Sequence, residues 1–321
     1  MQDVLEQLKT VVSNRVKENE PMSKYTNFRI GGPAKYFVEV RSIDELKQVL
    51  SIAQTNEIAS VIIGGGSNML VADQGFDGIM IRLLMREIFI DKNSVQVGAG
   101  VPMILLSRKV GEACLAGLEW AITLPGTVGG AVRGNAGCFG GETKDHLVEV
   151  FVLSNGEVVA RSSAELAFGY RESAIKHSSD IVLSATFNLL PGDCNTIKQV
   201  MESNLAKRKA SQPLDAGSAG CMFKNYEIAS DEDLQRIQSK IDLPSEVVLA
   251  RRISAGWIID QLDLKGFQIG GAKVSDVHGN FLVNTGSATA DEIVQLIAFI
   301  KTRARDTYGI ILQEEVQYVG F

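Results

Sequence analysis

The sequence predicts an α+β protein of two or three domains, and three observations support this prediction. The chain of 321 residues is longer than a usual single domain. Segments in which apolar and polar residues alternate, as in strands, recur between amphipathic segments with helical spacing. Glycine-rich segments separate these elements at 64–66, 126–141 and 217–220. With 45% apolar and 22% charged residues, the composition is typical of a soluble protein with a sizeable core.

The first part of the chain is predicted to form a β/α unit. We expect a helix and connector over 1–20, a strand over 35–40, a helix over 42–55 and a strand over 60–63. Ser42 is the predicted N-cap of the second helix, and Glu45 follows three residues on. The second strand runs into Gly64-Gly-Gly-Ser-Asn68. A strand, a helix and a strand that ends in glycines are typical of a unit with an exposed ligand edge.

The glycines that begin at Gly64 do not form the dinucleotide-binding fingerprint. In that fingerprint, G-x-G-x-x-G follows the first strand and opens a helix. Here a strand-like segment over 69–72 comes next. The P-loop pattern G-x-x-x-x-G-K-[ST] is also absent from the sequence, which argues against a P-loop NTPase.

The middle of the chain is predicted to be α+β and to contain most of the glycine-rich backbone that could bind a ligand. Short strands are expected within 79–101, a helix over 102–116, and strands over 147–153, 156–161 and 181–189.

Residues 124–142, LPGTVGGAVRGNAGCFGGE, form a glycine-rich stretch between these elements. Glycine lowers the stability of a helix or strand interior, so the stretch indicates tight turns or close contact with a ligand. A mobile loop is the alternative interpretation. However, Val128, Ala131 and Phe139 stand where a solvated linker carries Ser, Lys or Glu. We therefore expect ordered backbone that offers N–H groups to an anion such as a diphosphate.

The last part of the chain is expected to form a further unit. We predict a basic helix over 196–211, a glycine-rich segment over 217–225, a helix over 254–262, strands over 267–275 and 281–284, a helix over 289–308, and a closing strand over 313–319. Lys207, Arg208 and Lys209 form either a solvated face of the basic helix or a phosphate-binding group.

Charge and targeting signals argue against several partners. The net charge of −6 gives no electrostatic reason to expect nucleic acid or an acidic membrane as a partner. No segment has the apolar length of a membrane span, and the first residues, MQDVLEQLKTVV, contain acids that a signal peptide lacks. The four cysteines include no C-x-x-C pair and predict no disulfide framework. We expect a cytoplasmic protein, and the sequence indicates no protein partner.

Metal and serine-hydrolase chemistry have little support. The histidines at 146, 177 and 278 are far apart, none lies in H-E-x-x-H, and no Cys/His spacing suits zinc, so no metal is expected. The G-x-S-x-G elbow of a hydrolase is absent. The three glycine-rich segments remain, and they favour one buried diphosphate cofactor and one anionic substrate.

Three further residues have both a structural and a functional interpretation. Arg171, in FGYR, forms either a surface salt bridge or a grip on a carboxylate. Cys221, in SAGCMFKN, is most simply a buried, inert thiol. Glu315 lies in the closing EEVQYV segment, where alternation puts it on the face opposite Glu314. One of these two acids is expected to point inward, where a carboxylate needs a partner or a function.

A series of segments, in order and over nearly the whole chain, resembles the UDP-N-acetylenolpyruvoylglucosamine reductases of bacterial peptidoglycan synthesis. These segments are YTNFRIGGPA, GGGSNMLV, LPGTVGGAVRGNAGCFGGE, FGYRES, SAGCMFKN, FQIGGAKVS with FLVN, and EEVQYVG. Only a short segment separates FGYRES from SAGCMFKN. In this respect the chain resembles the type II form, which lacks the inserted tyrosine-bearing loop of type I.

The resemblance implies an FAD-dependent enzyme with NADPH as co-substrate, which reduces UDP-N-acetylglucosamine enolpyruvate to UDP-N-acetylmuramate. It also implies three α+β domains. Residues 1–78 with the C-terminal strand 310–321, and residues 79–195, would form a vanillyl-alcohol-oxidase-like (PCMH-type) FAD-binding module. Residues 196–309 would form the substrate-binding domain.

The same resemblance implies roles for single residues. Contacts to FAD would come from Gly64, Gly65, Gly66, Ser67, Asn68, Pro125, Gly126, Thr127, Gly129, Gly130, Asn135, Ala136 and Gly137. Arg171, Cys221 and Glu315 would be catalytic. Substrate contacts would come from Tyr170, Arg208, Asn225 and His278.

The implied reaction has two half-reactions, in which NADPH reduces FAD and the reduced flavin then delivers a hydride to C3 of the enolpyruvyl group. Arg171 would stabilise the negative charge that develops at C2 and the carboxylate. Cys221 departs from the family pattern, because this position is usually the serine that protonates C2. A thiol is a better acid than an alcohol, with a reference pKa of about 8.5, so the role remains chemically sound.

Two rival functions remain at this point. The first is an oxidase of the same flavoprotein superfamily, which would act on an alcohol or sugar without an NADPH half-reaction. No His or Cys is positioned as in the covalently flavinylated members. The second is a non-catalytic nucleotide-binding protein, which would not need Arg171, Cys221 and Glu315 in matching motifs.

Overall fold

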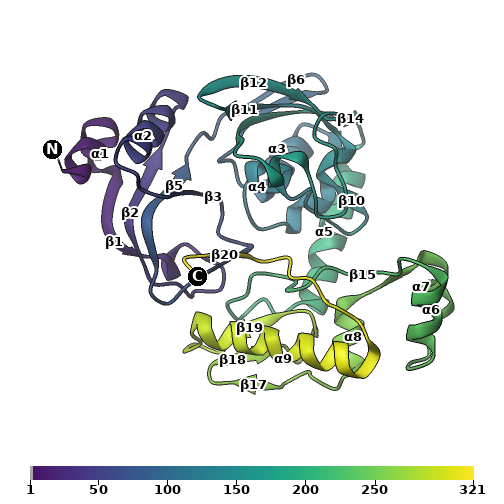
Figure 1. Cartoon of the computed structure of the whole chain (residues 1–321). Coiled ribbons are helices and arrows are strands. Elements are labelled where there is room, and N and C mark those ends of the chain that lie inside the picture. Colours follow the sequence, from purple (N-terminus) through teal and green to yellow (C-terminus); the bar gives the residue numbers. More distant parts are fainter. Residues whose placement is uncertain (1–2) are drawn as a thin grey trace. The chain divides into compact units, whose positions relative to one another are not determined.

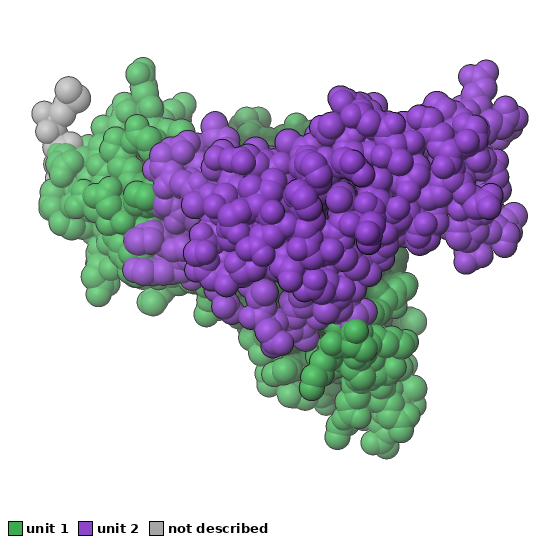
Figure 2. Space-filling model, turned by 90° about the horizontal axis from the view of Figure 1, so that it is seen from below, with its two compact units in different colours: residues 1–20, 33–66, 76–210 green, residues 21–32, 67–75, 211–321 purple. Residues whose placement is uncertain are grey.

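The computed structural model describes residues 3–321, and residues 1 and 2, where the predicted N-terminal helix begins, lie outside the described residues. The chain forms two compact units, which Figure 2 shows in different colours. The first unit comprises residues 1–20, 33–66 and 76–210, and the second comprises residues 21–32, 67–75 and 211–321. Helices and strands occur in both units, as the α+β prediction requires.

The first sheet of the first unit has the strand order β1-β2-β5-β3. Its strands are β1 (Val16–Pro21), β2 (Pro33–Val40), β5 (Phe76–Leu83) and β3 (Ser60–Ile63). Helices α1 (Val4–Val12) and α2 (Ile43–Thr55) pack against β2 (Figure 1). The Ser42 hydroxyl accepts a hydrogen bond from the Glu45 N–H at 3.2 Å, which confirms the predicted cap. The expected connector after the first helix is instead strand β1, and β5 separates the two strands of the predicted β/α unit.

The second sheet of this unit is antiparallel, with the order β12-β11-β13-β7-β6. Its strands are β12 (Glu157–Ser162), β11 (Leu147–Ser154), β13 (Ile181–Asn188), β7 (Ser94–Gly98) and β6 (Ile88–Asp91). Helix α3 (Met103–Glu112) follows β7 in the chain, and the predicted helix and strands of this region are confirmed. A continuous core of buried apolar residues joins the two sheets and their helices.

The stretch 124–142 contains more regular structure than its glycines predict. It forms the short helix α4 (Val128–Arg133) and the strands β9 (Gly137–Cys138) and β10 (Gly141–Glu142), which pair antiparallel. The helix forms despite Gly129 and Gly130 because its apolar residues are buried and it packs against β13. Tertiary packing thus outweighs the low helix propensity of glycine here.

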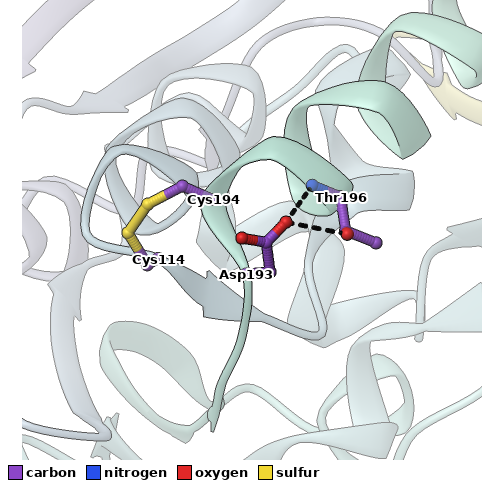
Figure 3. The surroundings of a disulfide bond; sticks show 4 residues. All are labelled: Cys114, Asp193, Cys194 and Thr196. Atoms are coloured by element: carbon purple, nitrogen blue, oxygen red, sulfur yellow. Dashed lines mark hydrogen bonds between the residues drawn. A yellow bond between two sulfur atoms is a disulfide. The ribbon is translucent and has the colours of Figure 1, made fainter.

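Helix α5 (Cys194–Ser211) begins at a disulfide that joins Cys194 to Cys114, just after α3 (Figure 3). The two Cα atoms lie 4.7 Å apart. Strands β8 (Leu115–Ala116) and β14 (Leu190–Pro191) pair beside this bond and bring the two cysteines together. Asp193 accepts hydrogen bonds from the Thr196 N–H at 2.8 Å and the Thr196 hydroxyl at 2.9 Å. The prediction of no disulfide framework was wrong, because sequence spacing carries no information about a pairing across 80 residues.

The second unit is built around helix α9 (Ala290–Tyr308), which packs on the three-stranded sheet β17-β18-β19 (Figure 1). The strands of this sheet are β17 (Gln268–Ile269), β18 (Ala272–Val274) and β19 (Leu282–Asn284). A capping box of Thr289 and Glu292 starts α9, and Gly309, with a φ of 70°, ends it. Helix α8 (Ala255–Gln261) contributes to the same core.

The remaining elements of the second unit are short. Strand β20 (Gln317–Val319) pairs parallel with β4 (Met69–Val71), and β15 (Tyr226–Glu227) pairs with β16 (Arg252–Ile253). Helices α6 (Asp231–Gln238) and α7 (Ser245–Ala250) were not predicted from the sequence. Both helices are short, with eight and six residues, and Ile237 is the one residue of the two that is buried.

The predicted three-domain division, 1–78 with 310–321, 79–195 and 196–309, stays a prediction. The boundary at 78/79 falls inside β5, and the boundary at 195/196 falls inside α5. The first predicted domain combines 310–321 with residues 1–78, and β20 does pair with β4. However, β20 and β4 both belong to the second compact unit.

Candidate active site

Two glycine-rich loops of the first unit lie directly against each other. A Cβ atom on Gly64 would lie 2.6 Å from the Thr127 Oγ1 atom, and one on Gly65 would lie 2.7 Å from the Gly126 Cα atom. The second loop is held from behind, because its Gly126 carbonyl accepts a hydrogen bond from the Met103 N–H at 3.0 Å. Any residue larger than glycine at 64 or 65 would push the loops apart, which explains the glycines in both motifs.

Gly129 and Gly130 extend this surface into the first turn of α4, in different environments. A Cβ atom on Gly129 would lie 3.1 Å from the Ala99 Cβ atom, so protein covers this side of the helix. A Cβ atom on Gly130 would meet only the Thr127 Oγ1 atom, at 3.8 Å. The backbone at Gly130 is therefore open beside the two touching loops. Bare backbone of this kind can bind an anion such as a diphosphate, and a larger side chain would occupy the space beside it.

Asn135 holds the β9–β10 hairpin in place. Its side chain is fully buried, and its Nδ2 group donates to the Glu142 Oε2 atom at 2.8 Å and to the Gly169 carbonyl at 2.9 Å. Its Oδ1 atom accepts from the Lys144 N–H at 3.2 Å. Because the side chain bonds protein groups on both ends, the predicted flavin contact of Asn135 would be made by its backbone.

Arg171 lies against the same hairpin. Its Nη2 group donates to the Gly137 carbonyl at 2.9 Å, and its guanidinium carbon lies 5.3 Å from the centre of the Tyr170 ring. Its backbone has a φ of 59°, a left-handed conformation that is uncommon for a residue with a side chain. The predicted site residues Asn135, Gly137, Tyr170 and Arg171 thus come together in one region of the first unit.

Arg208 reaches this region from the end of α5. Its Nη1 group donates to the carbonyl of Thr123, and the Thr123 hydroxyl lies 3.4 Å from the Cys138 Sγ atom. Burial raises the pKa of the Cys138 thiol, while the Thr123 hydrogen bond and the charges of Arg208 and Arg171 oppose this rise. The guanidinium groups of Arg171 and Arg208, which come from distant segments, therefore both affect the pKa of Cys138 in the β9–β10 hairpin. The neighbours Lys207 and Lys209 are exposed, in keeping with a solvated face.

In the second unit, residues 217–223 run beside two other segments. Cys221 forms a bridge with Phe281, and the Glu315 N–H donates to the Met222 carbonyl at 2.8 Å. The predicted catalytic residues Cys221 and Glu315 therefore lie on paired segments, although they are far apart in the sequence. Cys221 is half-buried, in contrast to the fully buried inert thiol that burial statistics favour.

Asn68 and Glu314 secure the segment that carries Glu315. The Asn68 Nδ2 group donates to the Glu315 carbonyl at 3.1 Å, and the Glu314 carboxylate pairs with Lys301 of α9 at 2.7 Å. Of the two neighbouring acids Glu314 and Glu315, Glu314 is thus the one that forms an ion pair with a lysine of α9. Ser67 and Asn68 belong to the second unit, whereas Gly64, Gly65 and Gly66 belong to the first, so the division between units falls inside this motif.

His278 and Asn225 flank the start of α8. The Asn225 Oδ1 atom accepts from the Ala255 N–H at 3.2 Å, and a Cβ atom on Gly256 would lie 2.9 Å from the His278 ring. The His278 Nδ1 atom accepts from the Asn280 N–H at 3.1 Å, so this network assigns the ring proton of neutral His278 to Nε2. Burial lowers the pKa of His278, with Asp260 opposing this effect and Lys265 adding to it. His278 thus presents a neutral N–H donor.

The lowered pKa of His278 predicts how stability depends on pH. Because the folded-state pKa lies below the reference value of 6.5, the unfolded chain binds more protons as the pH falls. Above pH 6.5, the free energies of unfolding of the wild type and His278→Gln should change in parallel. Below it, the wild type should lose stability relative to the variant until the folded-state pKa is passed. Urea unfolding of both proteins across this range measures the difference, and parallel curves at every pH would contradict the prediction.

Sequence reasoning missed several residues that organise these regions. Thr123 contributes a backbone carbonyl, which no side-chain motif marks, and Cys138 lies inside a stretch interpreted only through its glycines. Asn280 follows His278 by two residues, and its position next to a predicted site residue was the available signal.

Within residues 3–321, no group of three or more His, Cys, Asp and Glu residues is arranged to hold a metal ion. None of the helices in this part of the chain combines the length and apolar character that crossing a membrane requires.

Two family profiles match the chain. The profile described as "FAD binding domain" matches residues 34–162, and the profile described as "UDP-N-acetylenolpyruvoylglucosamine reductase, C-terminal domain" matches residues 212–319. The matched parts contain the touching glycine loops of the first unit and the Cys221, His278 and Glu315 segments of the second.

Similar proteins cover the chain from end to end. The UDP-N-acetylenolpyruvoylglucosamine reductase of Lactobacillus delbrueckii subsp. bulgaricus is 39% identical over 307 residues, which are 95% of each protein. That of Anoxybacillus flavithermus is 36% identical over 324 residues, 100% of this chain and 99% of the relative. The crystal structure of UDP-N-acetylenolpyruvylglucosamine reductase from Thermus caldophilus has a TM-score of 0.75 and 33% identity, and the match covers 95% of this chain and 99% of that one.

Proposed function

The chain belongs to the UDP-N-acetylenolpyruvoylglucosamine reductase family, and on this premise we propose which of its residues perform the reaction. The protein is an FAD-dependent oxidoreductase. With NADPH as reductant, it reduces UDP-N-acetylglucosamine enolpyruvate to UDP-N-acetylmuramate in peptidoglycan precursor synthesis. The identity of 36% over the whole chain is the observation that carries this conclusion.

The glycine loops of the first unit hold the cofactor in this proposal. The diphosphate of FAD would lie along the two touching loops and the open backbone at Gly130, where the glycines place no side chain between the ligand and the main chain. The hairpin from Asn135 to Gly137 would lie near the flavin. When bound, FAD would supply the hydride chemistry that connects NADPH with C3 of the enolpyruvyl group.

Arg171 stabilises the charge that develops on the substrate. Transfer of a hydride to C3 leaves negative charge at C2 and on the carboxylate, which the planar guanidinium can bind through two parallel N–H groups. The Gly137 carbonyl and the Tyr170 ring already orient this side chain, so little reorganisation is needed during the reaction. Tyr170 and Arg208 bind the substrate from the same unit.

Cys221 donates the proton that completes the reaction at C2. Its half-buried position limits solvation of the thiol, and its segment is paired with that of Glu315. Glu315 acts on the substrate near the site of protonation. Asn225 and His278 bind the sugar nucleotide, and the His278 Nε2–H supplies a neutral donor.

The absorption spectrum tests the cofactor and the type of reaction. The purified protein should show the visible bands of oxidised flavin, and NADPH should bleach them under nitrogen. Addition of the enolpyruvyl sugar nucleotide should then restore the colour. A colourless protein, or colour that returns only with oxygen, would contradict the reductase function and favour a binding protein or an oxidase.

The position of the diphosphate can be tested with two adjacent glycines. Gly130→Val should fold but bind no FAD, because its side chain enters only the space assigned to the diphosphate. Gly129→Val should also lose FAD, with an additional loss of stability because its side chain meets Ala99. Flavin content and thermal unfolding of both variants are the measurements. Stoichiometric FAD in both would exclude this placement.

The cellular setting is also a proposal. We place the reaction in the cytoplasm, where NADPH and nucleotide-linked precursors are made, and connect its product through the cell wall to cell shape and division.

A further inference from the structure

Asn280 lies in the turn between His278 and strand β19, and it is almost completely buried, with 2% of its surface exposed. Its side chain forms two hydrogen bonds with the backbone of one residue. The Oδ1 atom accepts from the Phe223 N–H at 2.9 Å, and the Nδ2 group donates to the Phe223 carbonyl at 2.8 Å. A neighbouring strand would supply the same pair of bonds through its backbone. The side chain thus acts as a strand partner for residues 221–223.

The backbone of Asn280 continues this arrangement. Its carbonyl accepts from the Met222 N–H at 2.8 Å, and its N–H donates to the His278 Nδ1 atom at 3.1 Å. All four polar groups of Asn280 are therefore used. Three of them bind Met222 and Phe223, and the fourth sets the orientation and tautomer of the His278 ring.

The bonds to Met222 and Phe223 act on the segments of Cys221 and Glu315 without including these two residues. Cys221 directly precedes Met222, and the Met222 carbonyl also accepts from the Glu315 N–H at 2.8 Å. Asn280 therefore sets the position of the Cys221 segment, and through Met222 that of Glu315. Removing its side-chain bonds would leave the Phe223 N–H and carbonyl unpaired at a buried position, which favours a shift of the segment toward new partners.

We propose that Asn280 is a positioning residue for the second half-reaction, because it holds the Cys221 thiol where it protonates C2. This inference rests on the proposed role of Cys221 as proton donor. Asn280 bonds protein groups, so it acts through Cys221 and not on the substrate itself. Misplacement of a reacting group by about 1 Å costs on the order of 100-fold in rate, so loss of this clamp should be kinetically visible.

Asn284 provides a matched control in the same unit. It is also buried, and its side chain also forms hydrogen bonds with backbone groups on both ends. Its Nδ2 group donates to the Phe28 carbonyl at 3.0 Å, and its Oδ1 atom accepts from the Gly286 N–H at 2.8 Å and the Ala288 N–H at 3.0 Å. These side-chain bonds reach none of residues 221–223. Substitution of Asn284 therefore reports the effect of losing a buried asparagine alone.

The test compares Asn280→Asp with Asn284→Asp in stopped-flow measurements of both half-reactions. Asn280→Asp keeps the acceptor for the Phe223 N–H but places an oxygen against the Phe223 carbonyl. Reduction by NADPH should stay within about twofold of wild type, while reoxidation by the enolpyruvyl substrate should slow by about 100-fold. The solvent deuterium isotope effect on reoxidation should rise, because proton transfer becomes the slow step. Asn284→Asp should lower the unfolding temperature while changing neither half-reaction by more than about twofold.

Other outcomes overturn the inference. Equal slowing of both half-reactions in Asn280→Asp, or slowing without a larger isotope effect, would make Asn280 a purely structural residue. If Cys221→Ala reoxidises slowly and Asn280→Asp reoxidises at the wild-type rate, only the role of Asn280 fails. If Cys221→Ala reoxidises normally, the proposed proton donor fails, and the positioning role fails with it. Asn280→Ser, whose hydroxyl can form one of the two bonds, is measured in the same way if Asn280→Asp does not fold.

Discussion

Replacing Cys221 with alanine is expected to give a protein that NADPH reduces at close to the wild-type rate but that the enolpyruvyl substrate reoxidises very slowly. The first half-reaction needs no proton donor to carbon, so it should proceed without the thiol. The second half-reaction has no group to protonate C2 in the variant. Stopped-flow spectroscopy of the flavin under nitrogen separates the two rates.

Cys221→Ser is the matched variant, and it should retain substantial activity. Its hydroxyl occupies the same place, and serine is the residue that the family pattern usually has here. The segment is held on both sides, by the bridge to Phe281 and by the bond from the Glu315 N–H to Met222, so the exchange of sulfur for oxygen should leave it in place. A near-normal rate of reoxidation in Cys221→Ala would remove Cys221 from the mechanism.

The thiol also has a chemical consequence that serine lacks. Peroxide or an alkylating agent should inactivate the wild type, bound substrate should protect it, and Cys221→Ser should resist. Cys138 is the appropriate control, because it is the other cysteine outside the disulfide and burial raises its pKa, which lowers its reactivity. Cys138→Ser should be inactivated like the wild type. If Cys138→Ser resisted inactivation, the reactive thiol would be Cys138 and not Cys221.

Arg171→Lys should slow reoxidation by the substrate by roughly two to three orders of magnitude, the scale for losing one donor to a developing oxyanion. Lysine keeps the positive charge but lacks the planar fork that binds a carboxylate through two N–H groups. It also loses the geometry in which Arg171 reaches the Gly137 carbonyl at 2.9 Å. Reduction by NADPH should barely change, because it involves no charge on the substrate carboxylate.

Arg161→Lys is a control on the same unit. Arg161 lies on β12 and forms a long ion pair with Asp180 at 3.9 Å, and such surface pairs contribute little. Both half-reactions should keep their wild-type rates in this variant. If Arg171→Lys instead damages both half-reactions equally, then Arg171 is structural or holds the flavin, and its proposed action on the substrate is wrong.

The sequence alone determined the features that depend on neighbouring residues and on the order of motifs. Apolar spacing was sufficient for the helices α2 and α9, and the predicted Ser42 cap of α2 forms as expected. The ordered motifs were sufficient for the family, the cofactor and the reaction. They also marked Cys221 as a departure from the family pattern, because a single substitution is visible without any coordinates.

Only the tertiary structure decided what depends on contacts between distant segments. It placed β5 between β2 and β3, formed a helix at Gly129 and Gly130 by burying their apolar neighbours, and joined Cys114 to Cys194. It also brought Arg208 to the Thr123 carbonyl and Asn280 to Phe223. Local propensity and spacing act over a few residues, whereas these pairings depend on which surfaces meet after folding. A backbone carbonyl such as that of Thr123 is the same in every residue, so its partner becomes identifiable only when the chain has folded.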